Sequence, residues 1–142
     1  MRCPFGWMMG IVLAASVAAC GGQAPVNEFG KQDGEQIRQM ISDFVAAYNA
    51  KDVDKIVTFF APNASLMPPN RATLNGTDAI KGYFQERVTT EGGTDLTIQP
   101  QVVEGHGALA YTVGSFTLKL QPPDGTAPRS DRGKVVWIVK KI

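Results

Sequence analysis

The spacing of apolar residues changes once along this chain, from a helical period in the first half to alternation in the second. From Leu96 onward, short alternations of apolar and polar residues, separated by glycines and prolines, are typical of strands. This order predicts an α+β fold in which helices pack on one face of an antiparallel sheet. The helical period is clearest between Asp33 and Ala50, where one face carries Ile37, Met40, Ile41, Phe44, Val45 and Tyr48.

Three helices are predicted before the long strands begin. The first spans Asp33 to Ala50, and the Asp33 side chain can accept hydrogen bonds from the free amides of the first turn. Asp52 can cap a second, short helix. Pro62 ends that helix, because proline disfavours helical geometry in the residue before it. The third helix spans Thr77 to Val88.

Two extended segments are predicted around and after the third helix. A short strand covers Ala64 to Met67, and residues 70–76 form a loop. A longer extended segment covers residues 96–104. Pro100 lies within it, and a proline in such a position either interrupts pairing or marks an edge strand.

Two further strands complete the predicted sheet. The first covers residues 108–120, where a bulge near Gly114 would bring two sets of apolar side chains to one face. The second covers residues 134–142. Between Val135 and Val139 every residue is apolar, which is typical of a strand covered on both faces.

The N-terminus is typical of an export signal. Arg2 precedes an apolar run over residues 7–15, small residues follow, and Cys20 comes directly after them. The run is too short to remain in a bilayer as a spanning helix, which needs ~20 apolar residues. The layout resembles a bacterial lipoprotein signal, which implies removal of residues 1–19 and attachment of lipid to Cys20. An ordinary signal peptide cleaved nearby is the alternative.

The resemblance to a lipoprotein implies a location and a domain plan. Gly21 follows the cysteine, in place of an aspartate that would indicate retention in the inner membrane. We therefore expect an anchor in the outer membrane, facing the periplasm. Several acyl chains hold a protein stably on a membrane, where a single chain does not. Residues 20–32 are predicted to be a flexible tether, and residues 33–142 the folded domain.

Charge and cysteine content limit the classes of function. Removing residues 1–19 leaves 13 basic and 13 acidic residues, a balance that does not indicate nucleic-acid binding. Cys3 leaves with the signal and Cys20 would be acylated. No disulfide is therefore expected in the mature chain, and its stability must come from a packed core.

A longer stretch of the sequence resembles a known family. Residues 41–64 are ISDFVAAYNAKDVDKIVTFFAPNA, residues 65–69 are SLMPP, and residues 74–80 are LNGTDAI. Together they resemble the SnoaL-like and ketosteroid-isomerase-like branch of the nuclear-transport-factor-2-like superfamily. The resemblance implies a curved antiparallel sheet wrapped into a cone by three helices, with an apolar pocket inside. It also implies a homodimer through the outer face of the sheet.

One departure from the family concerns the C-terminus. In the family a further strand follows, which usually carries a tryptophan, whereas this sequence ends at residues 140–142. We expect either a fragment or truncated reading frame, or a sheet with one edge left unpaired.

The resemblance provides no catalytic residues at the positions where the isomerases carry theirs. The carboxylate base falls at Pro68, beside Met67, and the tyrosine donor falls at Phe44. None of these side chains can transfer a proton. Tyr48 lies one helical turn beyond Phe44 and is the nearest substitute, although a tyrosine on such a face is usually part of the core. We therefore expect an interior without a proton-transferring carboxylate.

Other catalytic and metal chemistry is not indicated. His106 is the single histidine and lies between two glycines in a predicted turn. Carboxylates are not clustered at metal-ligand spacing, and the glycines do not form a phosphate loop. We expect neither a cofactor nor a metal.

A ligand pocket is the remaining functional feature. Apolar walls with a few polar groups are typical of such pockets, and the alternative is that the same residues simply fill the core. Three functions remain open: an anchored domain that binds a small apolar ligand or a protein partner without catalysis, an isomerase, hydratase or cyclase with relocated catalytic residues, and a dimerisation or scaffold module. The residues predicted to line the pocket are Tyr48, Phe60, Met67, Phe84, Tyr111, Ser115 and Trp137.

Overall fold

The structure of the protein, a computed structural model, describes residues 28–141. The predicted signal peptide and the predicted lipidation site at Cys20 lie outside the described residues. Most of the predicted tether also lies outside them, but its last residues, from Phe29 onward, contact or belong to the first helix.

Three helices form one layer of the fold. The first begins at Lys31 rather than at the predicted Asp33, because Gly30 precedes its first turn and Asp33 lies within it. The predicted cap of the second helix is confirmed: the Asp52 carboxylate accepts a hydrogen bond from the Lys55 amide at 2.9 Å. The bounds are Lys31–Asn49 for α1, Val53–Val57 for α2 and Thr77–Thr89 for α3.

The strands of the described residues form two antiparallel sheets. A small one pairs β1 with β2, which lies in the segment predicted to be a loop. The larger one has the order β3-β4-β5. β3 continues through Pro100 without a break and lies at an edge of this sheet, so the edge-strand alternative is confirmed. The bounds are Ser65–Leu66 for β1, Leu74–Asn75 for β2, Gly93–His106 for β3, Leu109–Leu120 for β4 and Arg129–Lys140 for β5.

The register of the larger sheet places its bulges in β3. β4 and β5 pair without a shift along their whole length. Between β3 and β4 the register shifts twice, once at residues 94–97 and once at residues 100–102. The predicted bulge in β4 near Gly114 is therefore wrong, because the extra residue lies on the opposite strand. Gly114 permits the close approach: a Cβ atom there would lie 2.5 Å from the carbonyl oxygen of Gln99.

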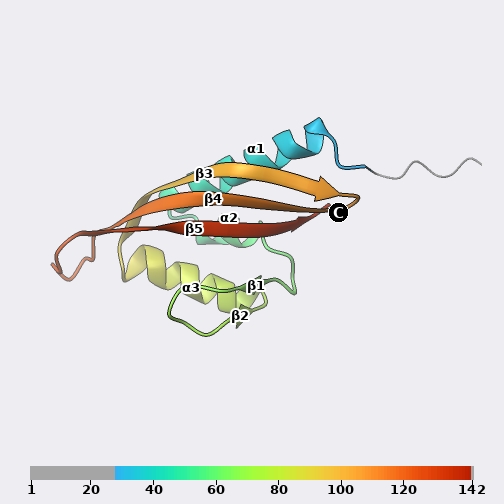
Figure 1. Ribbon diagram of the computed structural model, residues 1–142. Coiled ribbons are helices and arrows are strands. Elements are labelled where there is room, and N and C mark those ends of the chain that lie inside the picture. Colours follow the sequence, from blue (N-terminus) through green and yellow to red (C-terminus); the bar gives the residue numbers. More distant parts are fainter. Residues whose placement is uncertain (1–27, 142) are drawn as a thin grey trace, which may run out of the picture.

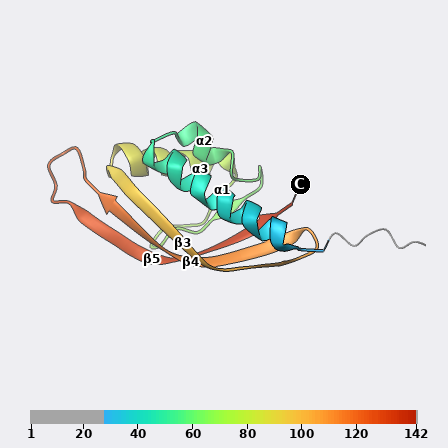
Figure 2. The same cartoon turned by 90° about the horizontal axis from the view of Figure 1, so that it is seen from above.

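The helices cover one face of the bent β3–β4–β5 sheet (Figures 1 and 2). α1 crosses this face diagonally, and α2 and α3 lie beside α1 (Figure 2). Inward-facing side chains of β4 and β5 pack against the helices, and the alternate side chains point away from them. The predicted fold class, an α+β fold with three helices on a curved antiparallel sheet, is confirmed.

The last strand shows how the two faces of the sheet differ. On β5, Val135, Trp137 and Val139 are half-buried on the helix side. Val136 and Ile138 point away from the helices, and Ile138 is 76% exposed. Val135, Trp137 and Val139 of the apolar run therefore face the core, while Val136 and Ile138 form an exposed apolar surface on the outer face of the sheet.

Candidate functional site

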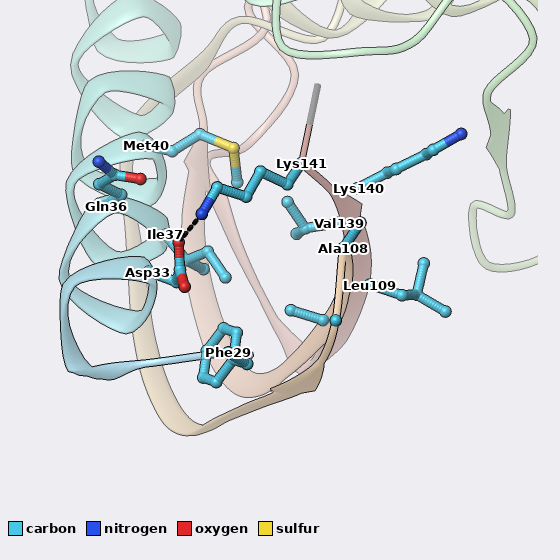
Figure 3. A pocket seen from close by; sticks show the side chains of 12 residues that line it. Phe29, Asp33, Gln36, Ile37, Met40, Ala108, Leu109, Val139, Lys140 and Lys141 are labelled. Atoms are coloured by element: carbon cyan, nitrogen blue, oxygen red, sulfur yellow. Dashed lines mark hydrogen bonds and ion pairs between the residues drawn. The ribbon is translucent and has the colours of Figure 1, made fainter. Parts of the chain in front are cut away.

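A pocket of about 300 Å³ lies where α1 begins, at one end of the larger sheet. Its walls come from the first turns of α1, the hairpin between β3 and β4, and the end of β5 (Figure 3). The side chains that form its apolar walls are Phe29, Ile37, Met40, Ala110 and Val139. These walls are suited to contact an apolar molecule.

An ion pair between Asp33 and Lys141 crosses the mouth of this pocket (Figure 3). The ammonium group of Lys141 donates to the Asp33 carboxylate at 2.7 Å, and the Lys141 amide donates to the carbonyl oxygen of Ala108 at 2.8 Å. Asp33 also accepts a hydrogen bond from the amide of Gly30 at 3.0 Å. The Lys141 and Gly30 hydrogen bonds hold the pKa of Asp33 below its usual range, so the carboxylate is charged at neutral pH.

Asp33 corrects one expectation from the sequence. The sequence predicted an interior without a proton-transferring carboxylate, with Asp33 capping a helix. The helix period places Asp33 on the same side of α1 as Ile37 and Met40, so its carboxylate borders the pocket. The pocket therefore has an acidic group at its edge, paired with Lys141.

Phe29 closes one side of the pocket by packing on Gly105 of β3. A Cβ atom at Gly105 would lie 2.5 Å from the Phe29 ring and 2.8 Å from the side chain of Ala110. Glycine at this position therefore lets the aromatic ring lie against the strand. The contact ties the segment before α1 to the hairpin that forms the opposite wall.

A second hollow, of about 430 Å³, adjoins Phe29 on another side. Lys31, Glu35 and Arg38 contribute to its lining, together with Val103. This charged lining is better suited to water than to an apolar molecule.

Four of the seven residues predicted to line a pocket meet in the core instead. Tyr48 and Phe84 have ring centroids 6.2 Å apart, and Phe60 lies 5.8 Å from Phe84. Trp137 packs edge-to-face against Phe44 at 5.1 Å. These rings form one packed cluster, and none of them lines the pocket beside α1.

The other three predicted residues lie elsewhere. Met67 is exposed after β1. Tyr111 and Ser115 belong to the side of β4 that points away from the helices, because β4 contains no bulge to turn them inward. The hydroxyl of Tyr111 donates to Glu104 on the same outer face at 2.5 Å. The structure therefore does not bring these three residues together with Tyr48.

Tyr48 is the buried candidate for chemistry on α1. The residue is 2% exposed, and its hydroxyl has no hydrogen-bond partner within residues 28–141. Burial raises the pKa of Tyr48 to about 12, because the phenolate is disfavoured away from water. Phe44, where the family carries its donor, is likewise part of the core, and Pro68 is buried. The Tyr48 hydroxyl therefore stays protonated near neutral pH, and Phe44 and Pro68 have no proton to transfer.

A network of charges at the C-terminal end of α3 had no signal in the sequence. The carboxylate of Glu91, in the turn between α3 and β3, is contacted by Arg71 at 3.2 Å, by Arg129 at 3.4 Å and by Arg87. Arg87 also contacts Asp131 on β5 at 3.1 Å. Arg71 also pairs with Glu86, so three arginines meet three carboxylates, and the network joins the helix layer to the start of β5.

The residues that form the pocket were missed for a reason that the structure makes clear. Phe29 lies in the segment predicted to be a tether, and Lys141 follows the last strand. Neither belongs to an apolar period that a helix or strand pattern could detect. The two glycines that flank His106 at the hairpin, Gly105 and Gly107, were the available signal, because glycines often mark a close approach of another segment.

Two features that residues 28–141 lack bear on the class of site. No helix in this range combines the length and apolar composition that crossing a bilayer requires. The same range contains no group of three or more His, Cys, Asp or Glu residues that could hold a metal ion.

A family comparison agrees with this architecture. A family model described as a SnoaL-like domain matches residues 41–141. The match begins within α1 and continues past the end of β5, so it covers most of the residues that the structure describes.

Solved structures with the same fold are found among bacterial proteins. A ketosteroid isomerase-like protein from Erwinia carotovora has 13% identity and a TM-score of 0.70, with 80% of this chain and 87% of that chain covered. A nuclear transport factor 2-like protein from Salmonella enterica has 17% identity and a TM-score of 0.68, with 77% and 80% covered. A Nostoc punctiforme protein of unknown function with a cystatin-like fold has 16% identity and a TM-score of 0.60, with 81% and 84% covered. At these identities the likeness concerns the fold.

Proposed function

We propose that this protein, which belongs to the SnoaL-like domain family, binds a small apolar molecule in the pocket beside α1 without transforming it. The observation that carries the proposal is the lining of that pocket. Apolar side chains form most of the wall of an open pocket of about 300 Å³, and the Asp33–Lys141 pair stands at its mouth. Apolar walls with a few fixed polar groups are the usual composition of small-molecule sites.

Catalysis by relocated residues is the second candidate, and Asp33 is the observation that favours it. A general base must lie within hydrogen-bond reach of the bound ligand, and a carboxylate at the edge of the pocket is in such a position. Lys141 and the Gly30 amide, however, lower the pKa of Asp33 and make it a weak proton acceptor. Tyr48 lies in the core with a pKa of about 12. Binding without reaction therefore fits the chemistry of these groups better.

The proposal is tested with N-phenyl-1-naphthylamine, an uncharged fluorophore whose emission rises in apolar surroundings. Met40 lines the pocket and is half-buried, so Met40→Trp should fill part of the space. We expect the affinity for the probe to fall by about tenfold, the equivalent of roughly 1.4 kcal/mol.

Ser42→Trp is the matched control, because Ser42 is exposed on the same helix and does not line the pocket. Its affinity for the probe should equal that of the unmodified protein. A probe that does not bind, or that binds both tryptophan variants equally well, contradicts the proposal.

The location of the binding domain is a second part of the proposal. Cys20 carries the lipid that holds the protein on the outer membrane, facing the periplasm. The support comes from the sequence: a charged residue, an apolar run, small residues and then the cysteine. A short segment then connects Cys20 to the described domain.

A homodimer through the outer sheet face is the third part. Tyr111 on β4 and Val136 and Ile138 on β5 are exposed there, and Tyr111 is directly opposite Ile138 in the register. An exposed apolar surface of this kind is typical of a protein–protein interface. A second copy of the chain presents the same surface, which a two-fold symmetric contact can cover.

A further inference from the structure

We infer that the ligand is a single-chain amphiphile with an acidic head group, taken up from the membrane on which the lipid anchor holds the protein. This rests on the pocket and on the anchor proposed above. Three features support it: the charge at the mouth, the shape of the walls, and the end of the fold at which the pocket lies.

The mouth of the pocket is better suited to a negative head group than to a positive one. The side chain of Lys141 is 46% exposed, whereas that of Asp33 is 17% exposed and is shared with the Gly30 amide. An incoming group therefore meets the ammonium first. An acidic head group can share Lys141 with Asp33, while Asp33 keeps its hydrogen bond to Gly30.

The walls behind the mouth are suited to an alkyl chain. Ile37 and Met40 from α1 face Val139 from β5 across the pocket (Figure 3). These side chains offer hydrocarbon surface to the part of a ligand that lies beyond its head group. Burial of the apolar surface of the chain is then the main source of affinity.

The position of the pocket indicates where such a ligand comes from. Phe29 lines it, and the described chain begins one residue earlier, at Glu28. Cys20 precedes Glu28 by eight residues, which cannot span more than about 29 Å even when fully extended. A lipid on Cys20 therefore keeps this end of the fold close to the bilayer surface, where single-chain amphiphiles are concentrated.

The head group is tested by displacement of N-phenyl-1-naphthylamine with dodecanoate, dodecanol and dodecyltrimethylammonium, which share a chain length. We expect dodecanoate to bind about tenfold more tightly than dodecanol, and the cationic compound to bind most weakly. Lys141→Met keeps most of the side-chain length and removes the charge, so it should abolish the preference for dodecanoate.

Two variants make this test specific. Lys140→Met is the control: Lys140 borders the pocket, but its side chain points away from Asp33 and Lys141 (Figure 3), so the preference should be unchanged. Asp33→Asn retains an oxygen for the Gly30 amide and removes the competing charge, so it should strengthen dodecanoate binding. An equal affinity for all three compounds, or a loss of preference in Lys140→Met, overturns the inference.

The source of the ligand is tested with phospholipid vesicles that contain a fatty acid labelled with an anthroyloxy group. Trp137 packs against Ile37 and Ala110 in the wall of the pocket, so energy transfer from Trp137 reports uptake of the label. The lipidated protein on vesicles should take up the label about tenfold faster than Cys20→Ser protein in solution at the same concentration. Equal rates overturn the membrane source.

These outcomes separate the inference from the proposed function. If the naphthylamine probe binds but the protein shows no preference for dodecanoate, the pocket is an apolar site and an acidic amphiphile is excluded as its specific ligand. If neither the probe nor any of the dodecyl compounds binds, both the proposed function and the inference fail.

Discussion

Tyr48 and Gly93 are packed so closely that a Cβ atom at Gly93 would lie 2.2 Å from the phenolic oxygen of Tyr48. The absence of a side chain at the start of β3 therefore makes room for the hydroxyl of a tyrosine on α1. That hydroxyl is buried and has no hydrogen-bond partner within residues 28–141. The contact between Tyr48 and Gly93 is therefore one of shape.

Tyr48→Phe should leave the free energy of unfolding unchanged or raise it by up to about 1 kcal/mol. The reason is that burying a polar group without a partner costs free energy, and the substitution removes that cost. Urea unfolding followed by circular dichroism measures the change. A large loss of stability would show that the hydroxyl has a partner after all.

Gly93→Ala is the companion variant and should act in the opposite direction. A methyl group at this position cannot be accommodated without moving Tyr48, and overpacking of this kind costs roughly 1–3 kcal/mol. The double variant with Tyr48→Phe should recover part of the loss, because the atom nearest to the new methyl group is then absent. Additive effects in the double variant would contradict the contact.

The pH dependence of stability should reflect the pair formed by Arg71 and Glu86. The Arg71 guanidinium contacts the Glu86 carboxylate through two hydrogen bonds, of 2.6 and 3.0 Å, and lowers the pKa of Glu86 below its ordinary value of 4.5. A carboxyl whose pKa is lower in the folded state contributes stability above its unfolded pKa. That contribution is lost as the pH falls through the folded value.

Glu86→Gln should therefore lose less stability than the unmodified protein between neutral pH and about pH 3. Arg71→Met should show the same weaker dependence, because it removes the cause of the lowered pKa. Urea midpoints measured across this range test both variants. A dependence as steep as that of the unmodified protein in either variant would exclude the pair as its source.

The proposed dimer makes Ile138 a sensitive position. Ile138→Lys places a charge in the middle of the outer apolar surface, so the dissociation constant of the dimer should rise by about tenfold or more. Gln121→Lys, in the exposed loop between β4 and β5, is the control and should leave it unchanged. Analytical ultracentrifugation measures both. Monomeric unmodified protein at high concentration would rule out the outer-face dimer.

The proposed anchor predicts a change of compartment for one variant. Cys20→Ser removes the sulfur to which lipid would be attached, so the protein should move from the membrane fraction of the cell to the fluid of the periplasm. Immunoblots of fractionated cells measure the distribution. Retention of the variant in the membrane fraction would mean that something other than lipid on Cys20 holds the protein there.

The sequence predicted the helical layer and the fold class well, because apolar periods are local signals. Ile37, Ile41, Phe44 and Tyr48 recur at helical spacing and are all buried. The two faces of β4 were misassigned because a bulge was expected in this strand near Gly114. β4 alternates without interruption, and the extra residues lie in β3.

The pocket was missed because it depends on contacts between distant segments. Asp33 and Lys141 are separated by 108 residues, and no periodicity relates them. Each also had a simpler local interpretation, as a helix cap and as the end of the chain. Four of the aromatic residues predicted to line the pocket, Tyr48, Phe60, Phe84 and Trp137, pack together in the core instead, because their large apolar surfaces favour burial.

The bulge at residues 100–102 has a consequence for how the chain can change in length. Gln101 has no partner residue on β4. Its deletion would therefore leave the side chains of residues 102–106 on the same faces of the sheet as now. In β5, which matches β4 residue for residue, the loss of one residue would turn the rest of the strand over. Trp137 would then face water and Ile138 the core. A one-residue deletion is therefore accommodated at this point of β3, whereas in β5 it reverses the facing of every later side chain.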